Sequence, residues 1–308
     1  MASLPGASAS RRGLSPTAVG VLFALPWLIG FLVFQLYPIA AAAYYSFTEF
    51  SLFDDPVWIG LDNYRDLLQD ERFFKSLYNT AYMTVIGVPL GLAFALICAL
   101  ALNTPSRLQP LYRAIVYLPT VVPIVAATYL WRWLLNSQYG YVNQVIGWFG
   151  LYQPLWQEDP FWTKPALLIM GLWLVGATTI IYLAALKEVP RSYYEAAEID
   201  GANAWSKFWN ITWPAISPVT LFQLVIGVIG SLQYFTQAYL FAQERLNQGG
   251  GGPKDSLLMY GMYVFQNAFQ YLDMGYASAL AWILFLISLA VTAVILGFAT
   301  RWVHYEGD

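Results

Sequence analysis

Cysteine, histidine and charged residues are all scarce in this chain of 308 residues. The single cysteine, Cys98, lies inside an apolar run, which excludes a disulfide framework and a cysteine metal site. The single histidine is His304, so the commonest metal ligand and acid-base side chain is almost absent. The formal net charge of -3 comes without a basic patch interleaved with aromatics, so nothing indicates binding to nucleic acid.

Lys, Arg, Asp and Glu make up 11% of the residues, whereas 58% are hydrophobic and the mean hydropathy is +0.52. Soluble chains normally carry about a quarter charged residues. The composition therefore predicts an all-α membrane protein, because apolar runs of sufficient length cross a bilayer as helices. We expect one transmembrane domain, 17–302, with six spans at about 17–45, 78–102, 111–135, 164–186, 215–241 and 275–302.

Polar tails at 1–16 and 303–308 flank the predicted transmembrane domain. Arg11 and Arg12, which precede the first apolar run, would also fit a cleaved signal peptide. The apolar run from about 17 to 45 is much longer than the roughly 7–15 apolar residues of a signal peptide. We therefore expect the first span to be retained.

Three longer polar loops separate the predicted spans, at 47–75, 136–163 and 243–272. The first loop contains the residues GLDNY at 60–64, which form either a short amphipathic element or part of a solvated loop. The third loop contains a run of glycines before Pro253. No Gly-Lys-Ser/Thr follows these glycines, so the chain has no Walker A phosphate loop.

The stretch 187–214 carries charges, a glycine and amphipathic spacing between two apolar spans, which predicts a helix-turn-helix outside the membrane. Ser192 is expected to cap the first helix and Gly201 to end it. Asn203 is expected to begin a second helix that Pro214 ends. A short polar helix pair between membrane spans suits docking onto another protein.

This stretch resembles the EAA loop of ABC importer permeases, in particular those of the carbohydrate family that includes maltose and glycerol-phosphate permeases. The matching residues are Glu195-Ala196-Ala197, Asp200-Gly201-Ala202, Ile211 and Pro214. The chain departs from the family pattern at Trp213, where leucine is usual. The resemblance implies a cytoplasmic coupling helix that inserts into a groove of an ATPase subunit and is formed by Glu195, Ala196, Ala197, Asp200 and Gly201.

The resemblance also implies a multi-pass protein of a bacterial or archaeal cytoplasmic membrane, with both termini in the cytoplasm. The partners that it implies are a second permease subunit, two cytoplasmic ATPase subunits that bind ATP and Mg²⁺, and an external sugar-binding protein. It implies no cofactor on this chain. Charge alone supports the orientation weakly, because only eight of the 15 Lys and Arg residues fall on the side assigned as cytoplasmic.

The predicted fifth span is rich in polar side chains for a membrane helix. They are Gln223, Ser231, Gln233, Tyr234, Thr236 and Gln237. Ser231, Tyr234 and Ala238 are expected to lie on one face of this span, at positions i, i+3 and i+7. Their chemistry suits a sugar, which takes hydrogen bonds at its hydroxyls and packing contacts on its apolar face. Hydrogen bonding between helices explains the same residues equally well.

The predicted fourth span offers a second candidate wall for a transport path, formed by Trp173, Gly176, Thr178 and Thr179. Close helix packing through small residues is the competing explanation. The resemblance supports Trp173, Ser231 and Tyr234, because similar permeases have a tryptophan at the first position and line their sugar site near the other two. The candidate substrate path is therefore Trp173, Thr178, Ser231, Tyr234 and Gln237.

The sequence contains no Ser-His-Asp set, no HExxH motif and no pair of acids inside a span, which favours a transport subunit over an enzyme. The spans hold essentially no acidic residues and the halves show no symmetry, which argues against the alternative, an ion-coupled secondary sugar transporter. We expect a permease subunit of an ATP-driven ABC importer for a sugar or oligosaccharide. It would form half of the path and couple to the ATPase through the EAA loop.

Overall fold

The computed structural model describes residues 16–242 and 250–304, so most of both predicted tails lies outside the described residues. The α-helices are α1 (Pro16–Phe31), α2 (Tyr37–Tyr45), α3 (Asp62–Leu67), α4 (Glu71–Tyr82), α5 (Val88–Asn103), α6 (Gln109–Val121), α7 (Ile124–Leu134), α8 (Tyr141–Trp148), α9 (Pro160–Trp173), α10 (Gly176–Glu188), α11 (Arg191–Ile199), α12 (Ala204–Lys207), α13 (Trp213–Leu232), α14 (Thr236–Ala242), α15 (Tyr260–Phe265) and α16 (Met274–Ala299). Short π turns join several of them, namely η1 (Leu32–Leu36), η2 (Met83–Gly87), η3 (Phe208–Thr212) and η6 (Gln266–Gln270). A two-stranded antiparallel ribbon pairs β1 (Thr48–Glu49) with β2 (Val57–Trp58).

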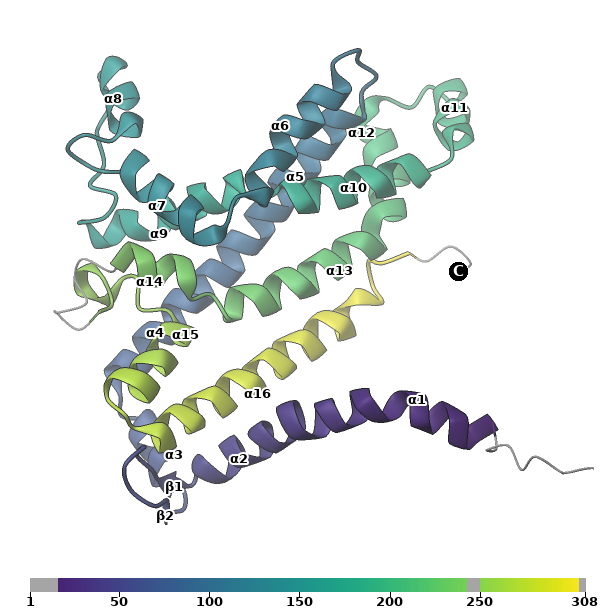
Figure 1. Cartoon of the computed structure of the whole chain (residues 1–308). Helices are drawn as coiled ribbons and strands as arrows, with labels where there is room; N and C mark the ends of the chain where they lie inside the picture. Colours follow the sequence, from purple (N-terminus) through teal and green to yellow (C-terminus); the bar gives the residue numbers. More distant parts are fainter. Residues whose placement is uncertain (1–15, 243–249, 305–308) are drawn as a thin grey trace, which may run out of the picture.

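The long helices pack as a bundle around α13. Helices α5, α10 and α13 contact one another, α16 packs on α13, and α2 packs on α16. In Figure 1, α1 begins, α10 ends, α13 begins and α16 ends towards the side of the molecule where α11 and α12 lie. The opposite side holds α3, α4, α8 and the β1–β2 ribbon.

Four helical segments are long and apolar enough to cross a membrane, at Gly20–Tyr45, Glu71–Asn103, Ala204–Ala242 and Met274–Ala299. Two bent pairs, α6 with α7 and α9 with α10, pass the same test together. The described residues therefore provide four to six spans, and six if each bent pair counts as one. These helical spans agree with the composition, which predicts a membrane protein built from helices.

The third predicted span, 111–135, consists of two helices rather than one. Helices α6 and α7 are bent by 100° relative to each other. Pro123 lacks a backbone N–H, and its ring pushes Val122 into an extended conformation with φ −71° and ψ 128°. The helix therefore stops before this proline, and α7 begins after it with a new direction.

The predicted fifth span is interrupted between α13 and α14, where regular helix is absent. The expectation of one continuous helix face is therefore wrong for Ser231, Tyr234 and Ala238. The break packs against α15, where the ring centroid of Phe235 lies 5.3 Å from that of Phe265. Contacts of this kind override helix propensity and leave no local signal in the sequence.

The segment after residue 250, predicted as the end of an external polar loop, contributes the main hydrophobic core. Its fully buried residues are Leu257, Leu258, Met259, Tyr260 and Met262. They pack against buried residues of α9, α14 and α16. The prediction of a loop is wrong here because this apolar run is too short to read as a span, yet it is long enough to fill the space between helices.

Three of the GLDNY residues, 62–64, form the start of α3 rather than a solvated loop, and Gly60 and Leu61 form the turn before it. Asn63 is buried, and its Nδ2 donates hydrogen bonds to the carbonyl oxygens of Ser46 (3.0 Å) and Thr48 (2.9 Å). The Tyr64 hydroxyl donates to Ser46 Oγ at 2.8 Å. These bonds fasten α3 to the chain that leaves α2.

Candidate functional site

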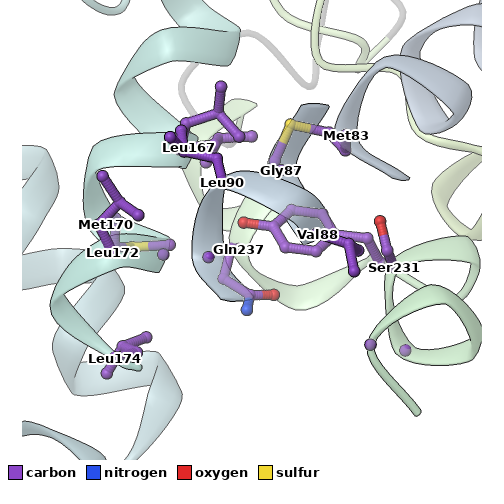
Figure 2. A pocket seen from close by; sticks show the side chains of 16 residues that line it. Met83, Gly87, Val88, Leu90, Leu167, Met170, Leu172, Leu174, Ser231 and Gln237 are labelled. Atoms are coloured by element: carbon purple, nitrogen blue, oxygen red, sulfur yellow. The ribbon is translucent and has the colours of Figure 1, made fainter. Parts of the chain in front are cut away.

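A cavity of about 230 Å³ lies between α5, α9 and α13, beside the break between α13 and α14. Its polar lining residues are Ser231, Tyr234 and Gln237. The other lining residues are apolar or glycine: Met83, Gly87, Val88, Leu90, Gly91, Leu167, Leu168, Met170, Gly171, Leu172, Leu174, Gly227 and Gly230. In Figure 2, Met170 and Leu172 lie on the α9 side, and Ser231 lies on the opposite side.

The cavity lining combines apolar walls with hydroxyl and amide groups and includes no charged side chain. Ser231 Oγ lies 3.0 Å from Thr84 Oγ1, which also donates to the Thr80 carbonyl at 2.9 Å. Hydroxyls and amides both donate and accept hydrogen bonds, as sugar hydroxyls do. The lining therefore suits a neutral, hydroxyl-rich molecule with apolar faces.

Glycines create much of the space in this cavity. Gly91, Gly171 and Gly230 line it, and a Cβ atom added at any of them would meet nothing within 4 Å. Gly227 lies closer to its neighbour, because an added Cβ would be 3.0 Å from Val88 Cγ1. Sequence reasoning named the fourth span as a candidate wall through Trp173 but did not identify α5 or the other lining residues of α9. Glycines inside apolar spans are a signal that could have indicated them.

The structure brings together three of the five predicted path residues, Ser231, Tyr234 and Gln237. Trp173 and Thr178 are not among the residues that line the cavity. The Trp173 ring instead lies 6.0 Å from that of Trp131 on α7, centroid to centroid. The neighbours of Trp173 on either side, Leu172 and Leu174, do line the cavity.

Gly176, at the start of α10, fits the packing explanation given for the fourth span. A Cβ atom added there would lie 2.3 Å from the carbonyl oxygen of Val116 on α6. Thr179 is buried, and its hydroxyl donates to the Val175 carbonyl of its own helix at 3.0 Å. These two residues let α10 approach its neighbours closely.

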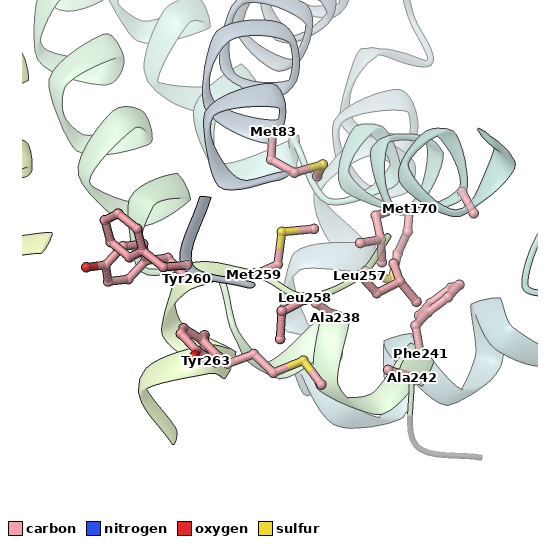
Figure 3. Packing of buried hydrophobic residues seen from close by; sticks show 14 of the residues in the cluster. Met83, Met170, Ala238, Phe241, Ala242, Leu257, Leu258, Met259, Tyr260 and Tyr263 are labelled. Carbon is pink, nitrogen blue, oxygen red and sulfur yellow. The ribbon is translucent and has the colours of Figure 1, made fainter. Parts of the chain in front are cut away.

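The hydrophobic core lies directly beside the cavity. Figure 3 shows Leu257, Leu258 and Met259 packed between helices, close to Met83 and Met170. The two methionines also line the cavity. The segment that sequence reasoning treated as a loop therefore supports one end of the cavity.

A buried polar group connects α4 and α9 to this core segment. Lys164 is 9% exposed, and its Nζ donates to Asn79 Oδ1 at 3.0 Å. Asn79 Nδ2 donates in turn to the carbonyl oxygens of Asp255 (2.8 Å) and Leu258 (2.9 Å). Sequence reasoning placed Lys164 only as the beginning of a span, and a lysine in an apolar run was the signal that it missed.

A second polar cluster surrounds Asp70, which caps α4 by accepting from Arg72 N at 2.8 Å. Its Oδ2 accepts hydrogen bonds from the hydroxyls of Tyr263 and Tyr276. Burial alone would raise the pKa of Asp70, but these hydrogen bonds and those from the backbone of Arg72 and Phe73 hold it below its usual value. Burial and the bond to Asp70 raise the pKa of Tyr263 to about 12.

The predicted helix-turn-helix contains α11 and α12, but two of its predicted boundaries are wrong. Pro190, not Ser192, precedes the first helical residue, and no side chain caps α11. Pro190 holds Val189 in an extended conformation, so the helix begins directly after the proline. At the other end, Pro214 does not stop the second helix. The π turn η3 precedes it, and a local π adjustment lets a helix continue past a proline into α13.

The predicted turn between the two helices is confirmed. Gly201 follows α11 with φ +77°, a conformation that favours glycine. Ala202 N donates to the Ala197 carbonyl at 2.8 Å, the bond that closes a Schellman turn. The side chain of Asn203 caps the next helix by accepting from Ser206 N at 2.8 Å.

The surface formed by α11 and α12 exposes both polar and large apolar side chains. Of the predicted coupling residues, Glu195, Ala196, Asp200 and Gly201 are exposed and Ala197 is half-buried. Ile199 is 87% exposed and Trp205 72% exposed. Large apolar side chains exposed on a polar helix pair are typical of a protein-docking surface.

Two side-chain contacts connect α11 to the segment before α13, one to Thr212 at the end of η3 and one to Lys207 on α12. The Tyr194 hydroxyl lies 2.9 Å from Thr212 Oγ1. Lys207 Nζ forms a salt bridge with Glu198 Oε1 at 2.8 Å. Helix α11 also follows α10 through a two-residue connection, so it is joined both to α10 and to the segment before α13.

A column of tryptophans runs from α12 to the end of α16. The ring centroids of Trp205 and Trp209 lie 5.6 Å apart, and those of Trp209 and Trp213 lie 5.9 Å apart. Trp213 stacks on Trp302 at 6.3 Å with an interplanar angle of 22°. Trp213, which stands where leucine is usual in the family pattern, thus joins α13 to the C-terminal side of α16.

Within residues 16–242 and 250–304, no group of three or more His, Cys, Asp or Glu side chains is arranged to hold a metal ion.

Relatives of this chain are named as permease proteins of transport systems. A probable ABC transporter permease protein of Bacillus subtilis, YesP, is 38% identical over 307 residues, which covers 98% of this chain and 97% of the relative. The sulfoquinovosyl glycerol transport system permease protein SmoG of Agrobacterium fabrum is 34% identical, with 92% and 91% covered. The lactose transport system permease protein LacF of Rhizobium radiobacter is also 34% identical, with 92% and 94% covered.

A bacterial ABC transporter that imports the acidic polysaccharide alginate has a similar fold, with a TM-score of 0.74 at 23% sequence identity. The likeness covers 92% of this chain and 95% of the other. Residues 87–304 match the model of the binding-protein-dependent transport system inner membrane component family. This match and the relatives show that the chain belongs to that family, the membrane components of binding-protein-dependent transport systems.

Proposed function

We propose that this chain is the permease subunit of an ATP-driven importer for a neutral sugar or oligosaccharide, and that its cavity forms part of the path. The observation that carries the proposal is the cavity lining, in which Ser231, Tyr234 and Gln237 face apolar walls. A relative named for lactose transport supports a neutral sugar substrate.

The absence of charge from the lining favours a neutral substrate. An acidic sugar in a low-dielectric cavity needs Arg or Lys, which pair with carboxylates through charge-assisted hydrogen bonds. The residues that line this cavity include neither. The substrate class therefore differs from that named for the alginate importer, although the fold is shared.

We further propose that α11 and α12 dock on a cytoplasmic ATPase. The complete transporter would contain a second permease subunit, two ATPase subunits that bind ATP and Mg²⁺, and an external sugar-binding protein. Both termini of this chain would lie in the cytoplasm. Exposed Ile199 and Trp205 supply the apolar contacts for docking, and exposed Glu195 and Asp200 supply polar ones.

The contacts around α11 support a lever mechanism. ATP-driven movement of the ATPase would displace α11, and the Tyr194–Thr212 and Glu198–Lys207 contacts would pass this displacement to the base of α13. Helix α13 carries Ser231 and two glycines of the cavity wall. The cavity would then change shape without any chemistry on this chain. An ion-coupled secondary transporter is not favoured, because the family is that of binding-protein-dependent systems.

Reconstitution of the assembled transporter in liposomes tests this function. Tyr234→Ala should lower the rate of sugar uptake, because the cavity loses an aromatic ring and a hydroxyl, whereas Trp173→Phe should retain uptake. The substrate is identified by measuring which neutral and acidic sugars bind to the external sugar-binding protein. Unchanged uptake by Tyr234→Ala, or uptake of acidic sugars alone, would contradict the proposal.

A further inference from the structure

A glutamine on α13 is buried without a hydrogen-bond partner for its amide nitrogen. Gln223 is 7% exposed, and its Nε2 donates to no group among the described residues. An unpaired buried polar group of this kind destabilises the folded protein, because its hydrogen bonds to water are lost without replacement. Buried polar groups in proteins are almost always paired, so this exception requires an explanation.

The neighbours of Gln223 along the helix show which way it faces. Thr220, one turn before it, interacts with the hydroxyl of Tyr182 on α10. Gly227, one turn after it, faces Val88 on α5. Gln223 therefore points into the space enclosed by α5, α10 and α13.

Gln223 also lies on the same stripe of α13 as the cavity lining. Positions 223, 227, 230 and 231 follow helical spacing, and the last three line the cavity. Between Gln223 and Ser231 this stripe consists of glycines, so no α13 side chain separates the two polar groups. Gln223 lies nearer the N-terminal end of α13, which follows α12 and η3.

We propose that Gln223 is a second contact for sugar hydroxyls, on the part of the path between the cavity and α11–α12. This inference rests on the proposed function. A carboxamide both donates and accepts hydrogen bonds, which matches a sugar hydroxyl. In this structure the amide is buried and unpaired. It would meet water and sugar when α13 separates from α5 and α10.

A purely structural role fits the contacts less well. A glutamine that holds a membrane bundle together does so through hydrogen bonds to a neighbouring helix, and the Gln223 amide nitrogen makes none among the described residues. The hydroxyl of Thr220 offers the contrast, because it donates to the Ile216 carbonyl at 3.0 Å and also interacts with the Tyr182 hydroxyl of the neighbouring helix α10. The amide nitrogen of Gln223 is therefore left with hydrogen-bonding capacity for a passing ligand.

Thiol labelling of the assembled transporter in liposomes tests this inference without knowledge of the sugar. In a Cys98→Ala background, Gln223→Cys, Ser231→Cys and Phe222→Cys are each exposed to a charged maleimide, without nucleotide and during ATP turnover. Phe222 is the matched control, because it adjoins Gln223 on α13 but is 58% exposed on the outside of the helix. We expect Gln223→Cys to react during turnover and to be protected without nucleotide, while Phe222→Cys stays unreactive.

Uptake measurements supply the second readout. Gln223→Leu should lower the rate of sugar uptake by about 2- to 10-fold, the effect of one hydrogen bond, and leave assembly intact. Thr220→Val should leave uptake unchanged. The inference is overturned if Gln223→Cys remains as unreactive as Phe222→Cys while Ser231→Cys reacts. If Ser231→Cys is unreactive as well, the cavity is not part of the path, and the proposed function fails with the inference.

Discussion

The turn at Gly201 allows the coupling role of α11 to be tested with a backbone change alone. Gly201 has φ +77°, and a Cβ atom added there would meet nothing within 4 Å. Gly201→Ala therefore introduces conformational strain and no steric clash. Gly150 is a matched control, because it has φ +68° and the same open surroundings but lies after α8, on the opposite side of the molecule.

The cost of the substitution follows from the backbone. A residue with a Cβ atom in the left-handed region costs about 1–2 kcal/mol relative to glycine. This energy lowers the equilibrium constant for closing the turn by about 5- to 30-fold. Gly201→Asn should cost less, because asparagine adopts this conformation more readily.

Uptake and ATP hydrolysis should be measured together on the reconstituted transporter. We expect Gly201→Ala to lower sugar uptake by several fold and to lower the amount of sugar moved per ATP hydrolysed. Gly201→Asn should have a smaller effect, and Gly150→Ala should behave as wild type. The reasoning is refuted if Gly150→Ala is impaired as much as Gly201→Ala, or if uptake per ATP is unchanged in Gly201→Ala.

Two further predictions concern stability and apply to the full chain in detergent micelles. Asn79→Leu should lower the free energy of unfolding by about 2–4 kcal/mol, because two carbonyls and Lys164 lose their partner. Asn210→Leu, which removes an exposed amide bonded within its own helix, should change it by less than about 0.5 kcal/mol; equal effects would contradict the role of Asn79. Because the folded pKa of Asp70 is lowered, its contribution to stability should be present at neutral pH and lost as the pH falls below about 4. Asp70→Asn should remove that part of the acid dependence of the thermal midpoint, and an unaltered acid profile would show that Asp70 does not contribute.

Features set by a few adjacent residues could be predicted from the sequence. Gly201 and Asn203 specify a turn and a cap through their own backbone and side-chain preferences, and the structure has both. The apolar runs likewise predict membrane helices, because length and composition suffice for that conclusion. Helix ends near prolines were predicted less well. Helix α11 begins directly after Pro190, whereas the helix continues through Pro214 into α13.

Features that depend on distant contacts could not be predicted. The break between α13 and α14 packs on α15, and the buried run at Leu257 is held by Asn79 from far away in the sequence. Ser231, Tyr234 and Gln237 were selected for their polarity, and they do line one cavity, although the continuous helix assumed for them is absent. The walls of that cavity, and the unpaired amide of Gln223, became visible only once the helices were placed together.

Site-specific crosslinking from Ile199 tests most directly whether α11 docks on the ATPase. A photoreactive side chain replaces Ile199, which is 87% exposed, or Trp148, which is 79% exposed at the end of α8. Each variant is irradiated in membranes that contain the complete transporter. The account predicts an adduct with the ATPase subunit from position 199 and none from position 148. An ATPase adduct from position 148, or an adduct between position 199 and the external binding protein, would contradict it.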